Sequence, residues 1–232
     1  GKALRDMRAS LDGRRYMERY TQMLTHELKS PLAAIQGASE LLEEDMPDSQ
    51  RDKFLRNIRQ ETQRSTDIID GLLKLSHLEA KDSLLQRQPI CASGLFNKVN
   101  QLISTRLSTK QLTLEICCPE FLKIYGDAMM LETALVNLLE NAIEFSPEKG
   151  VIHLSASVTH GRLSLSVMDH GPGLAPFVKD RAFEHFFSMR EKSKGSGLGL
   201  VFVKEVAMLH SGTVSIGNHH SGGAIACITL PE

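Results

Sequence analysis

The chain has 232 residues, a formal net charge of −1 and 41% hydrophobic residues, which is ordinary for a globular protein of one or two domains. The balanced charge and the 5% aromatic content provide neither a basic surface nor a stacking platform, so we expect no nucleic-acid partner. No apolar run approaches the ~20 residues of a membrane-spanning helix. Any membrane attachment is therefore expected only through segments that precede this chain.

Residues 14–80 show the apolar periodicity of two helices separated by turn and cap residues at 43–49. The two series are Leu24, Leu28, Pro31, Ile35, Ala38 and Leu42, then Phe54, Ile58, Glu61, Ser65, Ile68, Leu72 and Leu75. A lone helical hairpin leaves its apolar seam half covered, so we expect a homodimer with a four-helix bundle across two chains. The polar Glu61 and Ser65 interrupt this seam. Residues 1–13 have apolar residues at helical spacing and are predicted to end a signalling helix from upstream.

The pattern changes after residue 80. Residues 81–90 are polar and are predicted to be a linker, whereas residues 91–232 alternate between helix and strand patterns. Helices are expected at 91–110, 127–145 and 198–209, and strands at 112–118, 151–158, 163–169, 213–217 and 224–230. One layer of helices on a sheet, an α/β sandwich, is the natural architecture for such an order.

His26 and Glu27 form the first candidate for chemistry. If Leu24 and Leu28 face the seam, His26 lies on the outer face of the same helix, in water and beside a carboxylate. An exposed neutral imidazole is a competent nucleophile near neutral pH, and a neighbouring carboxylate can orient it or accept its proton. Taken alone, the pair is better explained as solvated residues of a helix surface.

Two glycine-rich turns form the second candidate. Asp169-His170-Gly171-Pro172-Gly173 follows a predicted strand, and Gly195-Ser196-Gly197-Leu198-Gly199 opens a predicted helix. Backbone N–H groups at a helix N-terminus bind anions such as phosphate. The spacing matches neither the dinucleotide fingerprint nor a Walker loop, so by itself it predicts only a turn.

Asn137 and Asn141 form the third candidate. They stand four residues apart in a predicted helix, so both carboxamides leave the same face. Oxygen ligands on one face suit Mg²⁺, which takes a few protein oxygens together with water and phosphate. A pair of asparagines on a wet helix face is the simpler explanation of this feature alone.

Together, five segments in order resemble the sequence boxes of sensor histidine kinases of two-component systems. They are the H box (26–32), the N box (137–141), the G1 box (169–173), the F box (183–187) and the G2 box (195–200). The resemblance runs from about residue 20 to the end and is specific because all five occur in the family's order. It implies the cytoplasmic catalytic core of a bacterial inner-membrane sensor, with a dimerisation and phosphotransfer domain (14–80) and an ATP-binding domain (91–232).

The resemblance also implies a role for each motif residue. His26 would accept the γ-phosphate of ATP, with Glu27 as base or orienter and Ser30 at the position that serves dephosphorylation of a partner. That partner would be the receiver domain of a response regulator. The metal would be Mg²⁺, held by Asn137 and Asn141. The remaining ATP-binding residues would be Asn137, Asn141, Phe145, Asp169, Gly171, Gly173, Arg190, Gly195, Gly197, Leu198 and Gly199, with Phe183 and Phe186 fastening the lid.

Three positions depart from the family pattern. Glu144 stands where a basic residue is usual near the phosphates, His185 where the F box often has Arg, and Ser30 where Thr or Asn is usual. Glu144 either shares the metal or turns outward toward Lys192 or Lys194. It also keeps open the alternative of a nucleotide-binding ATPase or degenerate kinase that acts as a dimeric regulatory scaffold.

Overall fold

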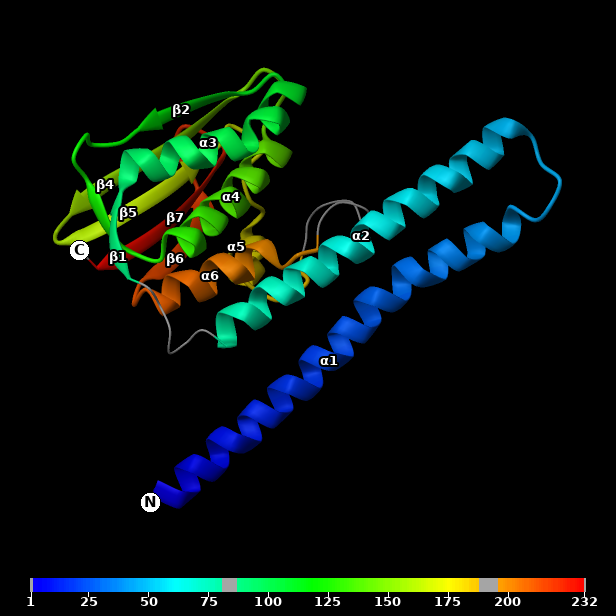
Figure 1. Cartoon of the computed structure of the whole chain (residues 1–232), viewed down its shortest axis with the longest axis horizontal. Coiled ribbons are helices and arrows are strands. Elements are labelled where there is room, and N and C mark those ends of the chain that lie inside the picture. The colour runs from blue at the N-terminus through cyan, green and yellow to red at the C-terminus, as the bar shows by residue number, and fades with distance from the viewer. Residues whose placement is uncertain (1, 81–86, 188–195, 232) are drawn as a thin grey trace. The chain divides into compact units, whose positions relative to one another are not determined.

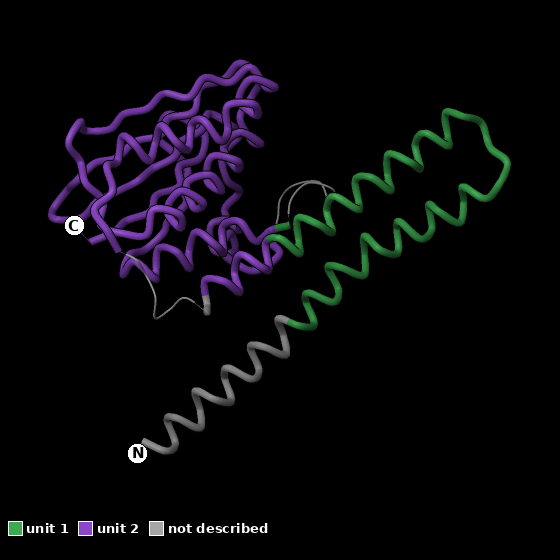
Figure 2. The backbone as a smooth tube through the Cα atoms, viewed as in Figure 1, with its two compact units in different colours: residues 1–70, 188–196 green, residues 71–187, 197–232 purple. Residues whose placement is uncertain are grey.

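A computed structural model describes residues 2–80, 87–187 and 196–231, with side chains from residue 21 onward except at residues 79 and 80. The chain divides into two compact units, residues 1–70 with 188–196 and residues 71–187 with 197–232 (Figure 2). Each unit is described by itself. Within the part of the chain that the structure describes, no helix is both long enough and apolar enough to span a bilayer.

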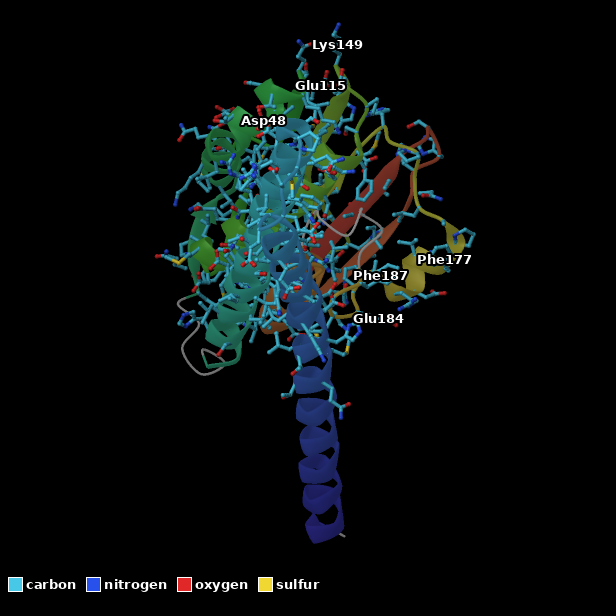
Figure 3. The ribbon with its side chains drawn as sticks, turned by 90° about the vertical axis from the view of Figure 1, so that its right-hand side faces the viewer. Asp48, Glu115, Lys149, Phe177, Glu184 and Phe187 are labelled. Atoms are coloured by element: carbon cyan, nitrogen blue, oxygen red, sulfur yellow. The ribbon has the colours of Figure 1, made fainter. Side chains whose placement is uncertain are left out.

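The first unit is a helical hairpin of α1 (Lys2–Leu41) and the greater part of α2 (Asp48–Ala80). Asp48 begins α2 (Figure 3), where a carboxylate interacts favourably with the helix dipole. Ala38 and Ile68 are buried in the hairpin, at 4% and 1% exposure. The predicted pair of amphipathic helices is therefore confirmed, and α1 continues without interruption from Lys2.

The last turns of α2 pack differently from what the heptad pattern predicts. Leu75 and Leu78 are buried in the same apolar cluster as the core of the second unit, and Leu72 packs against that cluster. We expected Leu72 and Leu75 to continue the seam of the helical bundle. That expectation is wrong for Leu75, because a heptad series does not specify which partner covers it.

The second unit is an α/β sandwich with helices on one face of a five-stranded sheet (Figure 1). The strand order is β2-β4-β5-β7-β6, in which β2 and β4 are parallel and the other pairs antiparallel. The strands are β2 (Thr113–Cys117), β4 (Val151–Thr159), β5 (Arg162–Met168), β6 (Thr213–Asn218) and β7 (Ala224–Pro231). The helices of the layer are α3 (Ala92–Thr109), α4 (Ala128–Phe145) and α6 (Gly199–Leu209).

The core lies between this helix layer and the sheet. Alternate residues of β4 (Ile152, Leu154, Ala156) and β5 (Leu163, Leu165, Val167) are buried, as expected for strands with one covered face. Leu131, Leu135, Leu138 and Leu139 of α4 are at most 2% exposed. The asparagines of α4 lie on a different face from these leucines, so the core orients the candidate binding face outward.

Three elements were not predicted. The strands β1 (Gln88–Cys91) and β3 (Lys123–Gly126) form a two-stranded antiparallel sheet, and α5 (Pro176–Arg181) is a short helix. Each has four to six residues, too few to display a period. The strand β1 occupies the last residues of the predicted linker, since Ile90 is buried and pairs with Ile124.

Candidate functional site

His26 projects from α1 into solvent, as the sequence predicts. Its side chain is 84% exposed, and its Nδ1 lies 3.8 Å from Oε1 of Glu27. Ser30 is also exposed, one turn further along the helix. Pro31 has no N–H, so the carbonyl of Glu27 has no intrahelical donor from that position. The imidazole is thus accessible to a reactant, with a carboxylate beside it and a locally weakened helix around it.

Glu27 in turn contacts an arginine that the sequence analysis did not single out. Nη2 of Arg64 donates to Oε2 of Glu27 at 3.0 Å, and Nη1 of Arg64 lies 3.9 Å from Oε2 of Glu61. The Arg64 and Glu61 side chains are only 11% and 14% exposed. Glu61, which interrupts the predicted apolar seam, is therefore part of an ion-paired group. The spacing of Glu61 and Arg64 in the sequence did not indicate a contact with α1.

The N-box helix α4 is fixed at both ends. Asp127 is its N-cap and accepts from the backbone N–H groups of Met129 and Met130 at 3.0 and 3.1 Å. At the other end, Nζ of Lys110 donates to three carbonyl groups, those of Ile143 (2.8 Å), Glu144 (2.7 Å) and Ser146 (2.7 Å). A cation at a helix C-terminus satisfies unpaired carbonyls and interacts favourably with the dipole.

Asn137 and Asn141 are both partly buried on this helix. A Cβ atom added to Gly199 would lie 3.4 Å from Oδ1 of Asn137. The N box therefore meets the beginning of α6, the helix that follows the G2 glycines. The N-terminal end of α6 and the asparagine face of α4 therefore lie together.

Asp169 is 7% exposed and directly follows strand β5. Its Oδ1 accepts from the backbone N–H groups of Gly171 at 2.8 Å and Ala224 at 3.1 Å. Among the described residues, no hydrogen bond is assigned to Oδ2. The carboxylate is thus held by one oxygen, and the other oxygen is available to accept from a ligand.

The G1 turn depends on its glycines for close packing. A Cβ on Gly171 would lie 2.5 Å from the carbonyl oxygen of Phe145, and Gly173 has a φ of +75°. Phe145, the last residue of α4, is 40% exposed. An accessible aromatic ring therefore lies next to the turn that begins with Asp169.

Two residues that support this turn were missed. The side chain of Asn218 accepts from the N–H of Leu174 at 2.6 Å and donates to its carbonyl at 3.0 Å. Gly223 has a φ of +79°, and any Cβ there would collide with the carbonyl oxygen of Asp169. Both lie some fifty residues after Asp169, and the pairing of β7 with β5 on one side and β6 on the other brings them to it.

The F-box segment packs against the G2 glycines. A Cβ on Gly197 (φ +68°) would lie 2.6 Å from the backbone carbon of Phe186. Phe186 also packs against the core, whereas Phe183 is only partly buried. Beside this segment, Arg181 forms an ion pair with Glu184 at 2.9 Å. Its guanidinium also lies over the ring of Phe187, 4.6 Å from the ring centroid (Figure 3).

Leu198 has its side chain in the core, at 1% exposure. Its contribution to a nucleotide site is therefore limited to its backbone. Arg190, Lys192, Lys194 and Gly195 lie outside the described residues, so the predictions for them, and the outward pairing of Glu144 with a lid lysine, stay predictions.

Asn137 and Asn141 fit a magnesium ion only if phosphate oxygens help to coordinate it. Within the described ranges, no group of three or more His, Cys, Asp or Glu is placed to hold a metal. The oxygens of Asn137 and Asn141 would provide two neutral ligands, and Mg²⁺ commonly completes its octahedron with water and substrate phosphate.

The chain matches two family models. Residues 16–81 match the His Kinase A (phospho-acceptor) domain, and residues 126–232 match the histidine kinase-, DNA gyrase B- and HSP90-like ATPase. The sensor protein CreC of Escherichia coli (strain K12) is 39% identical over 231 residues, which are 99% of this chain and 48% of CreC. The chain thus spans about half the length of this curated relative.

Solved structures have the same fold. Full-length ShkA in complex with AMPPNP has a TM-score of 0.63 and 29% identity, over 92% of this chain and 45% of ShkA. The histidine kinase ThkA in complex with the response regulator TrrA has a TM-score of 0.74, over 92% of this chain and 61% of that one, and at 22% identity it shows the fold alone. The helical hairpin carries an exposed histidine, the ATPase-type sandwich carries the N, G1 and G2 motifs, and both domain models match in order. The chain therefore belongs to the sensor histidine kinases.

Proposed function

We propose that this chain uses ATP to phosphorylate His26 and then passes the phosphoryl group to an aspartate of a response regulator. The observation that carries the proposal is the exposed His26, whose Nδ1 faces Glu27 at 3.8 Å. With Nδ1 turned to the carboxylate, Nε2 is the nitrogen that faces a reactant. A surface imidazole is accessible to a phosphorus atom, and the neighbouring carboxylate can orient the ring or accept its proton.

The nucleotide would bind in the second unit. Oδ2 of Asp169 would accept from the adenine amino group, while the ring of Phe145 would lie on the base. The backbone at Gly171, Gly173, Gly197 and Gly199 would approach the nucleotide closely, and the N-terminus of α6 would face its phosphates. Mg²⁺, held by Asn137 and Asn141 together with phosphate oxygens, would neutralise phosphate charge. For Arg190 and Gly195 we keep the predicted roles in phosphate binding.

The reaction is a phosphoryl transfer in which positioning and charge neutralisation do most of the catalysis. Nε2 of His26 forms a bond to the γ-phosphorus, and the bond from that phosphorus to the bridging oxygen of ADP breaks. The ring becomes cationic at this step, and its Nδ1 proton can pass to Glu27. ADP leaves with the electron pair of the broken bond.

We further propose a homodimer of the 14–80 hairpin, a receiver domain as phosphate acceptor and a position in the cytoplasm below a bacterial inner membrane. Family membership supports these assignments, and ThkA is described in complex with its response regulator TrrA. Ser30, four residues after His26, would position water if the chain also dephosphorylates its regulator.

Incubation with γ-³²P-ATP and Mg²⁺ tests the proposal. We expect base-stable, acid-labile label on the wild-type chain and none on the His26→Gln variant. A fluorescent ATP analogue should bind both equally, because the pocket residues belong to the other compact unit. Nucleotide binding without label on the wild-type chain would identify a degenerate kinase instead.

A further inference from the structure

We propose that Arg64 is a positioning residue for the phosphorylation of His26, which acts by holding the Glu27 carboxylate toward the imidazole. The inference rests on the proposed function and concerns the hairpin unit alone. It assigns a role to an arginine on α2 that lies 38 residues beyond His26 in the sequence.

The geometry joins four side chains in a row. Glu61 contacts Arg64 at 3.9 Å, Arg64 donates to Oε2 of Glu27 at 3.0 Å, and the other oxygen of Glu27 lies 3.8 Å from Nδ1 of His26. Exposure rises along the row, from 11–14% at Arg64 and Glu61 to 28% at Glu27 and 84% at His26. A buried anchor is thus connected to a solvent-facing nucleophile.

Stability of the hairpin does not explain this arrangement. Nε of Arg64 is buried without a hydrogen-bond partner among the described residues, and an unsatisfied buried donor is costly. Apolar residues such as Ile58 and Ile68 occupy neighbouring seam positions of the same helix, and replacing a buried ion pair by apolar residues is often neutral or stabilising. A charged group that is kept despite this cost in stability indicates a role other than packing.

The role of Arg64 follows from the rotation that the Glu27 carboxylate would otherwise be free to make. A glutamate on a helix surface samples several rotamers, most of which turn its oxygens to water. A bond from Arg64 to Oε2 restricts that rotation and leaves Oε1 on the side of Nδ1. When Nε2 bonds to phosphorus and the ring becomes cationic, the carboxylate is already on the Nδ1 side, 3.8 Å away, and has only to close that distance to accept the proton. A carboxylate that is oriented before the reaction raises the rate of the chemical step and leaves the affinity for ATP unchanged.

The test compares Arg64→Met and Arg64→Lys with two controls in otherwise intact protein. Arg59→Met removes an exposed arginine of the same helix, and Ile58→Val weakens seam packing without touching the carboxylate. We expect Arg64→Met to lower kcat of autophosphorylation roughly ten-fold, with KM for ATP unchanged, and Arg64→Lys to recover part of that loss. Thermal unfolding of each variant records the structural effect separately.

A double-mutant comparison separates positioning from general damage. If Arg64 acts through Glu27, adding Arg64→Met to Glu27→Gln should cost less than about two-fold more, because the positioned group is already changed. The inference would be overturned by any of three results. The kcat losses of the two single variants multiply in the double variant, Ile58→Val loses as much kcat as Arg64→Met, or Arg64→Met leaves kcat unchanged. Absence of label on the wild-type chain would instead refute the proposed function.

Discussion

Asp169 illustrates how one side chain can support the fold and, in the proposed function, bind a ligand as well. Two backbone N–H groups hold its Oδ1, and these bonds connect the G1 turn to the start of β7. In the proposed function, Oδ2 accepts from the nucleotide. A carboxylate fixed in this way presents an acceptor of constant direction, which suits recognition of an amino group on a base.

Asp169→Asn should weaken ATP binding roughly ten-fold or more, as expected for loss of a buried charge-assisted hydrogen bond of about 1.5–3 kcal/mol. The amide would keep its oxygen toward the two N–H groups and turn its NH₂ toward the adenine amino group, placing donor against donor. Calorimetric titration with ATP and GTP measures the change. Circular dichroism checks that the fold persists, and an unaltered dissociation constant for ATP would place Asp169 away from the base.

Beside Asp169, the residues that hold the site are mostly structural. Asn218 bonds both backbone groups of Leu174, and Gly223 makes room for the carbonyl of Asp169. Such residues set the geometry of the G1 turn.

At the scale of elements, a buried histidine connects two helices of the sandwich. His210, at 3% exposure, follows the end of α6. Its Nδ1–H donates to the carbonyl of Val206 at 2.7 Å, and its Nε2 accepts from the N–H of Asp127, the N-cap of α4, at 2.9 Å. Gly126 leaves room for the ring, since a Cβ there would lie 2.8 Å from it.

This arrangement requires a neutral ring and predicts an acid-sensitive fold. Burial chiefly lowers the pKa of His210, with a further lowering from the charge of Arg87, while the Val206 carbonyl and Asp127 act in the opposite direction. The unfolded chain therefore binds a proton more readily than the folded chain. The stability contribution is fully present above about pH 7 and is lost as the pH falls below the ordinary histidine pKa of about 6.5.

Chemical unfolding of the second unit between about pH 7.5 and pH 5.5 measures this effect. We expect the free energy of unfolding to fall toward acid in the wild type and to change less in His210→Gln. The variant should also be less stable at neutral pH by about 1–3 kcal/mol, since at least one buried hydrogen bond is lost. Parallel pH profiles for the two proteins would show that His210 is not the titrating group.

For the molecule as a whole, the apolar surface left by the hairpin is the main feature. Ile68 is buried within the unit at 1% exposure, whereas its neighbour Ile69 is 47% exposed and Leu32 of α1 is 57% exposed. Large exposed apolar side chains beside a seam are the expected signature of a helical bundle completed by a second chain.

Ile69→Asp should therefore dissociate the proposed dimer without unfolding the hairpin. A carboxylate in an apolar seam costs several kcal/mol, which shifts the dimer dissociation constant by two orders of magnitude or more. Light scattering over a concentration series measures the shift, with Thr66→Asp as a control at an exposed polar position of the same helix. A dimer of unchanged affinity would locate the interface elsewhere.

By itself the sequence determined the helical hairpin, the five main strands, the three helices of the sandwich and the positions of His26, Asn137, Asn141 and Asp169. The elements rest on local periodicity, and the site residues rest on the resemblance of five ordered motifs to a known family; both are visible along the chain. The short β1, β3 and α5 carry too few residues to show a period. The strands β1 and β3 form by pairing with each other, as at Ile90 and Ile124.

Tertiary structure alone decided which residues support the motifs. Arg64 reaches Glu27 because α2 folds back on α1. Asn218 and Gly223 reach the G1 turn because β7 pairs with both β5 and β6. Leu75 joins the core of the second unit rather than continuing the bundle seam. Contacts between residues distant in sequence depend on how elements pack, and a periodic pattern specifies that a face is covered without specifying what covers it.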